Sequence, residues 1–118
     1  MAFERLTDVR NEPNEVELTT IGRISGRESS EPVWFVRRDE NLYLLPVCGT
    51  DSQWYKNLLK TPTVRVAAGD TVYSGQAVPV TDPPEVNQVV ERFRNKYGAR
   101  QVDSYFSRHD VAVEVRPA

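Results

Sequence analysis

The feature that most constrains this fold is the segment Gly22-Arg23-Ile24-Ser25-Gly26-Arg27, which lies between two stretches with the composition of β-strands. Residues 16–21 alternate between apolar and polar side chains, and residues 32–36 form an apolar run with two aromatic side chains. The two glycines give the intervening segment the conformational freedom of a tight turn. The same turn carries two guanidinium groups and a hydroxyl, which suit a phosphate or a carboxylate. It is therefore either an anion-binding turn or a polar hairpin turn.

The rest of the chain predicts further short strands joined by turns. A polar cluster at residues 38–41 and the hairpin pair Gly69-Asp70 separate stretches with strand-like patterns. Residues 1–14 are polar and predict a loosely ordered lead-in. Because the connections are short, we expect a mostly antiparallel arrangement of the strands. The predicted strands cover residues 16–21, 32–36, 42–47, 64–68, 71–80 and 111–115.

Two helices interrupt the predicted strands. Residues 52–60 form a short helix that ends before Pro62, because proline disfavours helical geometry in the residue before it. Residues 82–97 form a longer helix, with prolines in its first turn and apolar side chains at helical spacing. A further helical turn is expected at residues 102–106. Antiparallel strands with peripheral helices favour a small, strongly curved barrel with helices over its openings.

Length and composition exclude several classes of protein. The 118 residues predict a single domain, 1–118, and a net charge of -2 provides no electrostatic footprint for nucleic acid. One cysteine and one histidine exclude an internal disulfide and argue against a Cys/His metal site, so we predict no metal. The sequence has no apolar run of the length of a membrane span or a signal peptide. We therefore expect a cytoplasmic protein that binds neither nucleic acid nor a membrane.

Several motifs occur together in an order typical of one known family. They are Thr19-Thr20-Ile21-Gly22-Arg23-Ile24-Ser25-Gly26, Pro32 ten residues after Gly22, Trp54-Tyr55-Lys56-Asn57-Leu58 and Thr61-Pro62-Thr63-Val64. With these motifs the chain resembles the deazaflavin-dependent nitroreductase family over about residues 16–116. That family belongs to the split β-barrel superfamily of pyridoxamine-phosphate-oxidase-like flavin and deazaflavin proteins. The resemblance implies a mainly β (α+β) fold: a six-stranded split β-barrel, mostly antiparallel, with two or three peripheral helices.

The resemblance also implies an activity. It is that of an oxidoreductase that transfers hydride from the reduced deazaflavin coenzyme F420 (8-hydroxy-5-deazaflavin) to a small electron-poor acceptor, such as a nitro compound or a quinone. Because hydride leaves from the coenzyme, no side chain need act as a strong acid or base, and we assign no catalytic residue. Many relatives are homodimers, and we expect a homodimer here.

Two positions depart from the family pattern and keep other cofactors in consideration. Ile24 stands where a second basic residue normally follows Arg23, and Ser29 stands at the expected position of a later arginine. Each missing charge-assisted contact is worth about 1.5–3 kcal/mol. Arg27 lies in the same turn and is a candidate replacement for one of them. Flavin mononucleotide (FMN), whose short phosphate tail needs fewer cations, is therefore an alternative cofactor. A cofactor-free binding or scaffold protein on the same barrel is a third hypothesis.

The resemblance assigns the cofactor site to three parts of the chain. The turn at residues 23–27 is expected to hold the phosphate, Trp34 and the loop 48–53 to border the ring, and Tyr97 to close the pocket. The helix start at residues 52–53 equally suits capping, and core packing is the default interpretation of Trp54 and Tyr97. The complete predicted cofactor site is Arg23, Ser25, Gly26, Arg27, Trp34, Cys48, Gly49, Ser52, Gln53, Trp54 and Tyr97.

Overall fold

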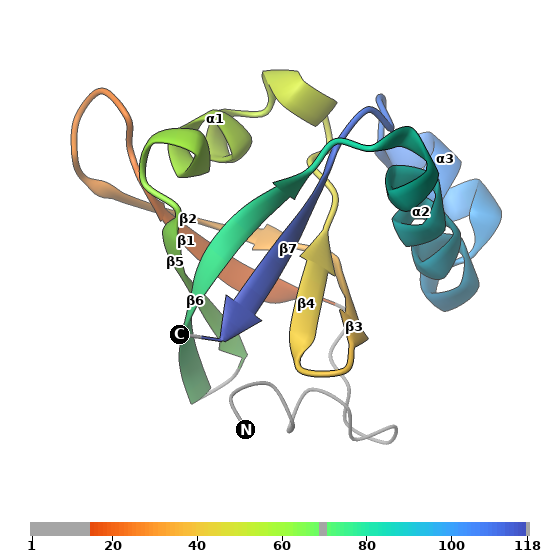
Figure 1. The fold of residues 1–118 in the computed structure, drawn as a ribbon, viewed down its shortest axis with the longest axis horizontal. Coiled ribbons are helices and arrows are strands. Elements are labelled where there is room, and N and C mark those ends of the chain that lie inside the picture. The colour runs from red at the N-terminus through yellow and green to blue at the C-terminus, as the bar shows by residue number, and fades with distance from the viewer. Residues whose placement is uncertain (1–14, 69–70, 118) are drawn as a thin grey trace.

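Seven strands form one antiparallel sheet in the computed structural model, which describes residues 15–68 and 71–117 (Figure 1). The order of the strands across the sheet is β2-β1-β5-β6-β7-β4-β3. Each strand pairs with neighbours that run in the opposite direction. The strands are β1 (Val16–Ile21), β2 (Glu28–Val33), β3 (Phe35–Arg38), β4 (Asn41–Leu44), β5 (Thr63–Ala68), β6 (Thr71–Val80) and β7 (Ala112–Pro117).

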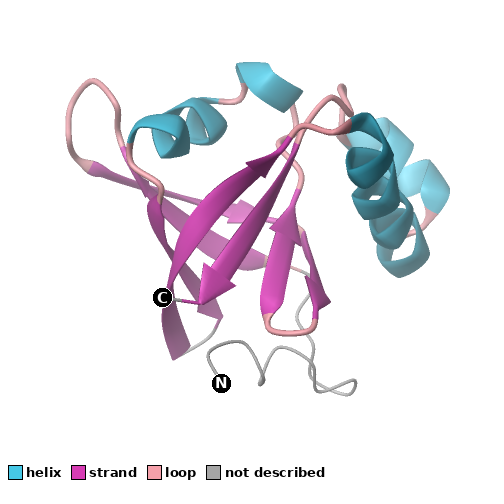
Figure 2. Ribbon diagram, viewed as in Figure 1, coloured by secondary structure: helices cyan, strands magenta, loops and turns pink. Residues whose placement is uncertain are grey.

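The helices cover two different parts of this sheet. Figure 2 shows one short helix over an end of the curled sheet and two helices packed side by side against one of its flanks. The first is α1 (Gln53–Lys60), preceded by the 3₁₀ turn η2 (Gly49–Asp51). The other two are α2 (Pro83–Tyr97) and α3 (Ala99–Tyr105). Both predicted helices are confirmed, and residues 102–105 of the helical turn expected at 102–106 belong to α3, which ends before Phe106.

The larger apolar core fills the inner face of the curled sheet. Directly opposed residues of antiparallel strands share a face, so the pairs Leu18↔Val66 and Leu42↔Val115 point to the same side. All four of these side chains are buried. Helix α1 closes this core from one end with three buried side chains at helical spacing, Trp54, Tyr55 and Leu58. The curvature of the sheet and the α1 plug together make the structure a half-barrel rather than a flat sheet.

A second core lies on the outer face of β3, β4 and β7. Helix α2 contributes four buried residues at positions i, i+3, i+4 and i+7, as its apolar spacing predicts. They pack with Val102 and Phe106 from the region of α3 and with Val36 and Ala112 of the sheet. The α2 residues are Val86, Val89, Val90 and Phe93. The outer face of the sheet is thus covered on one half by α2 and α3.

The predicted fold class is confirmed, but the prediction of six strands is wrong. The single strand expected at residues 32–36 is divided at Trp34 into β2 and β3, which lie at opposite edges of the sheet. The reason is that β2 starts at Glu28 and its first five side chains are exposed. Its sequence therefore lacks the alternation of apolar and polar residues from which a strand is predicted. The strand expected at 42–47 is also shorter and ends at Leu44. The lead-in 1–14 and the hairpin pair Gly69-Asp70 lie outside the described residues.

The two edges of the sheet are protected to different extents. At the β3 edge, the Tyr97 hydroxyl accepts a hydrogen bond from the Phe35 backbone N–H (3.0 Å) and donates one to the Phe35 carbonyl (2.9 Å). The Lys96 ammonium donates to the same carbonyl (2.9 Å). These side chains occupy backbone groups that would otherwise be available to another strand. The β2 edge carries Pro32, which lacks an N–H to offer.

We expect Tyr97→Phe to destabilise the fold by about 1–2 kcal/mol, because it removes the acceptor of the Phe35 N–H and one of the two donors to the Phe35 carbonyl. Equilibrium urea unfolding measures this loss. Tyr105→Phe is the matched control: Tyr105 stacks on the opposite side of the same Trp34 ring, and its hydroxyl makes no hydrogen bond to the rest of the described chain. Equal stability of the two variants would show that the Tyr97 hydroxyl does not protect the edge.

Candidate functional site

The turn between β1 and β2 is built by its own backbone hydrogen bonds. The Gly22 N–H donates to the Arg27 carbonyl (2.7 Å), and the Gly26 N–H donates to the Gly22 carbonyl (2.9 Å). Gly26 has a positive φ of 72°, a conformation that glycine adopts without strain. The Ser25 hydroxyl accepts a hydrogen bond from the Arg27 N–H (3.1 Å). The predicted tight turn is therefore confirmed, and it carries both arginines at the end of the strand pair.

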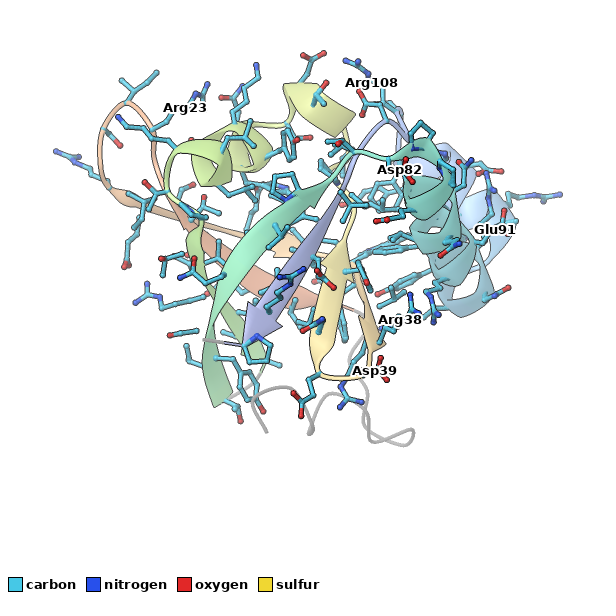
Figure 3. All side chains as sticks on the ribbon, viewed as in Figure 1. Arg23, Arg38, Asp39, Asp82, Glu91 and Arg108 are labelled. Carbon is cyan, nitrogen blue, oxygen red and sulfur yellow. The ribbon has the colours of Figure 1, made fainter. Side chains whose placement is uncertain are left out.

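Arg23 is held in place by two uncharged amide side chains of α1. Its guanidinium donates to Asn57 Oδ1 (2.9 Å) and to Gln53 Oε1 (2.8 Å). The backbone N–H of Arg23 also donates to Asn57 Oδ1 (3.2 Å). Asn57 is buried, and its own amide donates to the Thr20 hydroxyl (3.4 Å). The guanidinium is therefore oriented without being neutralised. Figure 3 shows Arg23 beside α1, at the base of the turn.

The acid that directly follows this turn in the chain is paired with another strand. Glu28 forms an ion pair with Arg65 of β5 (2.5 Å). The Lys60 ammonium donates to the Arg23 carbonyl (3.0 Å), which adds a further positive charge beside the turn. Within the described part of the chain, the Arg27 guanidinium has no ion-pair or hydrogen-bond partner. The turn therefore keeps a net positive charge.

A pocket of about 270 Å³ lies beside these cations. It is lined from three sides: by the turn, by the start of β2 and by α1. Ile24 and Ser29, which stand where the family pattern has basic residues, both contribute to the lining. The lining residues are Gly22, Arg23, Ile24, Ser25, Arg27, Glu28, Ser29, Gln53 and Asn57. We call this the turn pocket.

The loop that contains Cys48 is fixed by a network of charged and polar contacts to the segment before β7. Asp110 accepts hydrogen bonds from the Thr50 N–H (3.2 Å) and the Thr50 hydroxyl (3.0 Å). Arg108 pairs with both Asp110 (2.9 Å) and Asp51 (2.5 Å). Sequence reasoning missed this role of Asp110 because its partners lie about 60 positions away in the chain.

Ser52 occupies the N-cap position of α1 but does not cap it through its side chain. Its hydroxyl accepts a hydrogen bond from the Cys48 N–H instead (2.9 Å), and no side-chain capping bond forms. The capping interpretation of Ser52 is therefore wrong, because the nearby loop supplies a competing donor. The Cys48 side chain itself is exposed.

The remaining predicted site residues lie in the two cores. Trp34 is sandwiched between Tyr97 and Tyr105, with ring centroids 4.4 and 4.5 Å away. Trp54 is buried in the inner core. The structure thus brings Arg23, Ser25, Arg27 and Gln53 together at the turn pocket, and Gly26 lies in the same turn but does not line the pocket. It places Cys48, Gly49 and Ser52 in the adjoining loop and Trp34 and Tyr97 in the aromatic stack against α2.

The inner face of the sheet remains open along β2. Glu31 opposes the buried Leu18, and Ser29 opposes the buried Thr20, yet both β2 side chains are exposed. Partial burial raises the pKa of the Glu31 carboxyl. Burial, together with the nearby charge of Asp110, raises the pKa of the Tyr55 hydroxyl, which therefore stays protonated at neutral pH. Residues 15–68 and 71–117 contain no group of three metal-ligating side chains and no helix of membrane-spanning length and hydrophobicity.

We expect Gly49→Ala to destabilise the protein by more than about 2 kcal/mol. Gly49 has a positive φ of 56°, and a Cβ atom there would lie 2.1 Å from Asp110 Oδ1, so the loop would have to move away from Asp110. Thermal unfolding measures the loss. Thr50→Val is the matched probe, because it removes one hydrogen bond to Asp110 without strain. A wild-type melting temperature for Gly49→Ala would contradict this view of the loop.

The comparisons with known proteins agree on fold and family. The model of the F420H2-dependent quinone reductase family matches residues 6–116. HutZ, a heme storage protein from Vibrio cholerae, has 19% identity and a TM-score of 0.73, with 100% of this chain and 92% of that chain covered. An F420-H2-dependent reductase (FDR-A) has 22% identity and a TM-score of 0.68, with 87% and 94% covered.

A structure described as a domain-swapped dimer also has 22% identity and a TM-score of 0.68, with 87% of this chain and 80% of that chain covered. No curated protein matches the chain. At these identities the structural neighbours establish only the fold, and the match to the family model establishes the family. Because that model matches nearly the whole chain, this protein belongs to the F420H2-dependent quinone reductase family and is an oxidoreductase whose coenzyme is F420.

Proposed function

We propose that this protein reduces a quinone with hydride from F420H2 and holds the anionic part of the coenzyme at the turn pocket. The observation that carries this proposal is the state of the Arg23 guanidinium, which is oriented by two neutral amides and not paired with an acid. An ion pair with a carboxylate would offset this charge, and no described acid forms one with Arg23. An oriented and uncompensated guanidinium instead suits an anionic ligand.

The residues of the turn pocket fit the phosphate and the acidic tail of the coenzyme. Arg23 and Arg27 provide two guanidinium groups, and Lys60 adds a third cation nearby. Glu28 would repel a phosphate, but its charge is offset by Arg65. A volume of about 270 Å³ holds a phosphate and the start of its chain, and not a tricyclic ring as well. We therefore place the ring outside the turn pocket, toward the open inner face of β2.

The bound coenzyme supplies the hydride, so the protein contributes binding, orientation and exclusion of water. The Cys48 loop is a rigid border for the ring, because Asp110 and Arg108 fix it. Trp34 and Tyr97 form a firm aromatic wall at the junction of β2 and β3. We propose a quinone as the acceptor, in keeping with the family description, and a nitro compound as the alternative.

We further propose that the chain works as a cytoplasmic homodimer and that 1–118 is a single domain. The β2 edge supports the dimer, since its first five side chains are exposed and none of the helices in residues 15–68 and 71–117 covers its outer face. The neighbour described as a domain-swapped dimer is consistent with this proposal. Light scattering of the purified chain measures its mass in solution, and a monomer at micromolar concentration would remove this part of the proposal.

We expect oxidised F420 to bind the wild-type protein and Arg23→Gln to weaken binding by about 10- to 100-fold, the loss of one or two charge-assisted contacts. Fluorescence titration of the coenzyme measures this affinity. Arg116→Gln is the control, because this arginine is exposed on β7 and pairs with Glu114. FMN is titrated in parallel. Tighter binding of FMN than of F420, or equal affinities for Arg23→Gln and wild type, would overturn the proposed site.

The acceptor is tested separately by following F420H2 oxidation with a water-soluble benzoquinone and with a nitroimidazole. We expect faster turnover with the quinone. Turnover of the nitro compound alone would replace the acceptor and leave the coenzyme site intact, because the two assays report on different steps.

We expect Asn57→Asp to keep the fold and to weaken F420 binding by about tenfold or more. An aspartate retains the oxygen that accepts from Arg23 but adds a buried negative charge that neutralises the guanidinium. Gln53→Glu makes the same change at an exposed position, so solvent screening predicts a smaller effect. Asn95→Asp on α2 is the control. Unchanged affinity in a folded Asn57→Asp protein would show that the charge of Arg23 is not used for binding.

A further inference from the structure

A second cleft, of about 350 Å³, lies between α2 and the β3–β4 hairpin, and its walls are formed by residues other than those of the turn pocket. Helix α2 contributes Glu85, Gln88, Val89 and Arg92, which share one helix face at positions i, i+3, i+4 and i+7. The sheet contributes Arg38, Tyr43 and Val80. Figure 3 shows Arg38 on the flank of the sheet that carries α2. This volume is within the usual range for small-molecule sites.

The two arginines of this cleft have no acidic partner among the described residues, unlike four other arginines of the surface. Arg94 pairs with Glu91 and Asp103, and the arginines of β5, β7 and the loop before β7 also pair with acids. Arg38 and Arg92 form no ion pair with any described residue. Both line one cleft, where their like charges repel each other. An anion between them would relieve that repulsion and satisfy both guanidinium forks.

The other lining groups limit the kind of anion. The Tyr43 ring, Val80 and Val89 provide an apolar surface. Burial, and then the hydrogen bond to Glu114, raise the pKa of Tyr43, so its hydroxyl is neutral at physiological pH. Glu85 adds one carboxylate to the lining and disfavours a doubly charged ligand such as free phosphate. A singly charged carboxylate with an apolar body matches this combination of groups.

We propose that the cleft between α2 and the β3–β4 hairpin binds a small organic carboxylate, with its charged end at Arg38 and Arg92 and its apolar body against Tyr43, Val80 and Val89. This site is separate from the proposed coenzyme site and does not depend on the proposed function. The ligand would act on the protein as an effector or as a second substrate that carries an acid group.

The test is a titration of the ¹⁵N-labelled full chain with benzoate, followed by NMR chemical shifts. We expect the amides around Arg38 and of the Glu85–Arg92 face of α2 to shift and saturate. Benzamide, which has the same ring without the charge, is expected to cause no saturable shift. Arg92→Gln is expected to weaken benzoate binding by about tenfold. Arg100→Gln, an exposed arginine of α3, is the matched control and should leave the affinity unchanged.

The outcomes separate the alternatives. Equal shifts with benzamide, or shifts confined to the turn pocket, would overturn the proposal, and so would an unchanged benzoate affinity in Arg92→Gln. Inorganic phosphate is titrated in parallel, and tighter binding of phosphate than of benzoate would also overturn it. If Arg92→Gln fails to fold, Gln88→Ala takes its place, because it alters the same helix face without removing a charge. The positions of the benzoate-induced shifts in that variant then show whether the ligand binds in this cleft. Binding of F420 in these samples is expected to be unchanged, which separates this site from the coenzyme site.

Discussion

The buried side-chain amide of Asn57 links helix α1 to the β1–β2 turn. Asn57 sits in α1 beneath the β1–β2 turn, and its oxygen accepts hydrogen bonds from both the backbone and the side chain of Arg23. This double contact joins the helix that closes the inner core to the turn that carries the cations. A neutral acceptor achieves this without cancelling the charge, so the guanidinium is fixed in place and still available to an anion. The local fold and the proposed chemistry therefore depend on the same side chain.

The sheet has two edges with different roles. At β3 the helix α2 approaches closely enough for Tyr97 and Lys96 to occupy backbone groups of the strand. At β2 no helix of the described residues gives such cover, and Glu31 remains exposed on the inner face. This asymmetry follows from placing α2 and α3 together on one flank. It leaves the other flank, where the turn pocket lies, open to a ligand or to a second copy of the chain.

Much of the fold was predictable because the periodic segments are strongly apolar on one side. The stripe of α2 from Val86 to Phe93, the α1 plug and the Gly22–Arg27 turn all appear in the structure as expected. The division of one predicted strand at Trp34 was not predictable, since β2 is polar along most of its length. Hydrophobic periodicity detects burial, and an edge strand with exposed side chains has none to detect.

The sequence by itself determined the type of fold, the family and the presence of cations in the turn, because these depend on local patterns and on residue identity. Only the tertiary structure decided which charges remain available. Glu28 is next to Arg27 in the chain but pairs with Arg65 of another strand, and Arg23 is oriented by side chains 30 and 34 positions away. Such pairings depend on which strands and helices meet in space. Sequence separation carries no information about that, so the electrostatics of the site had to be read from the folded chain.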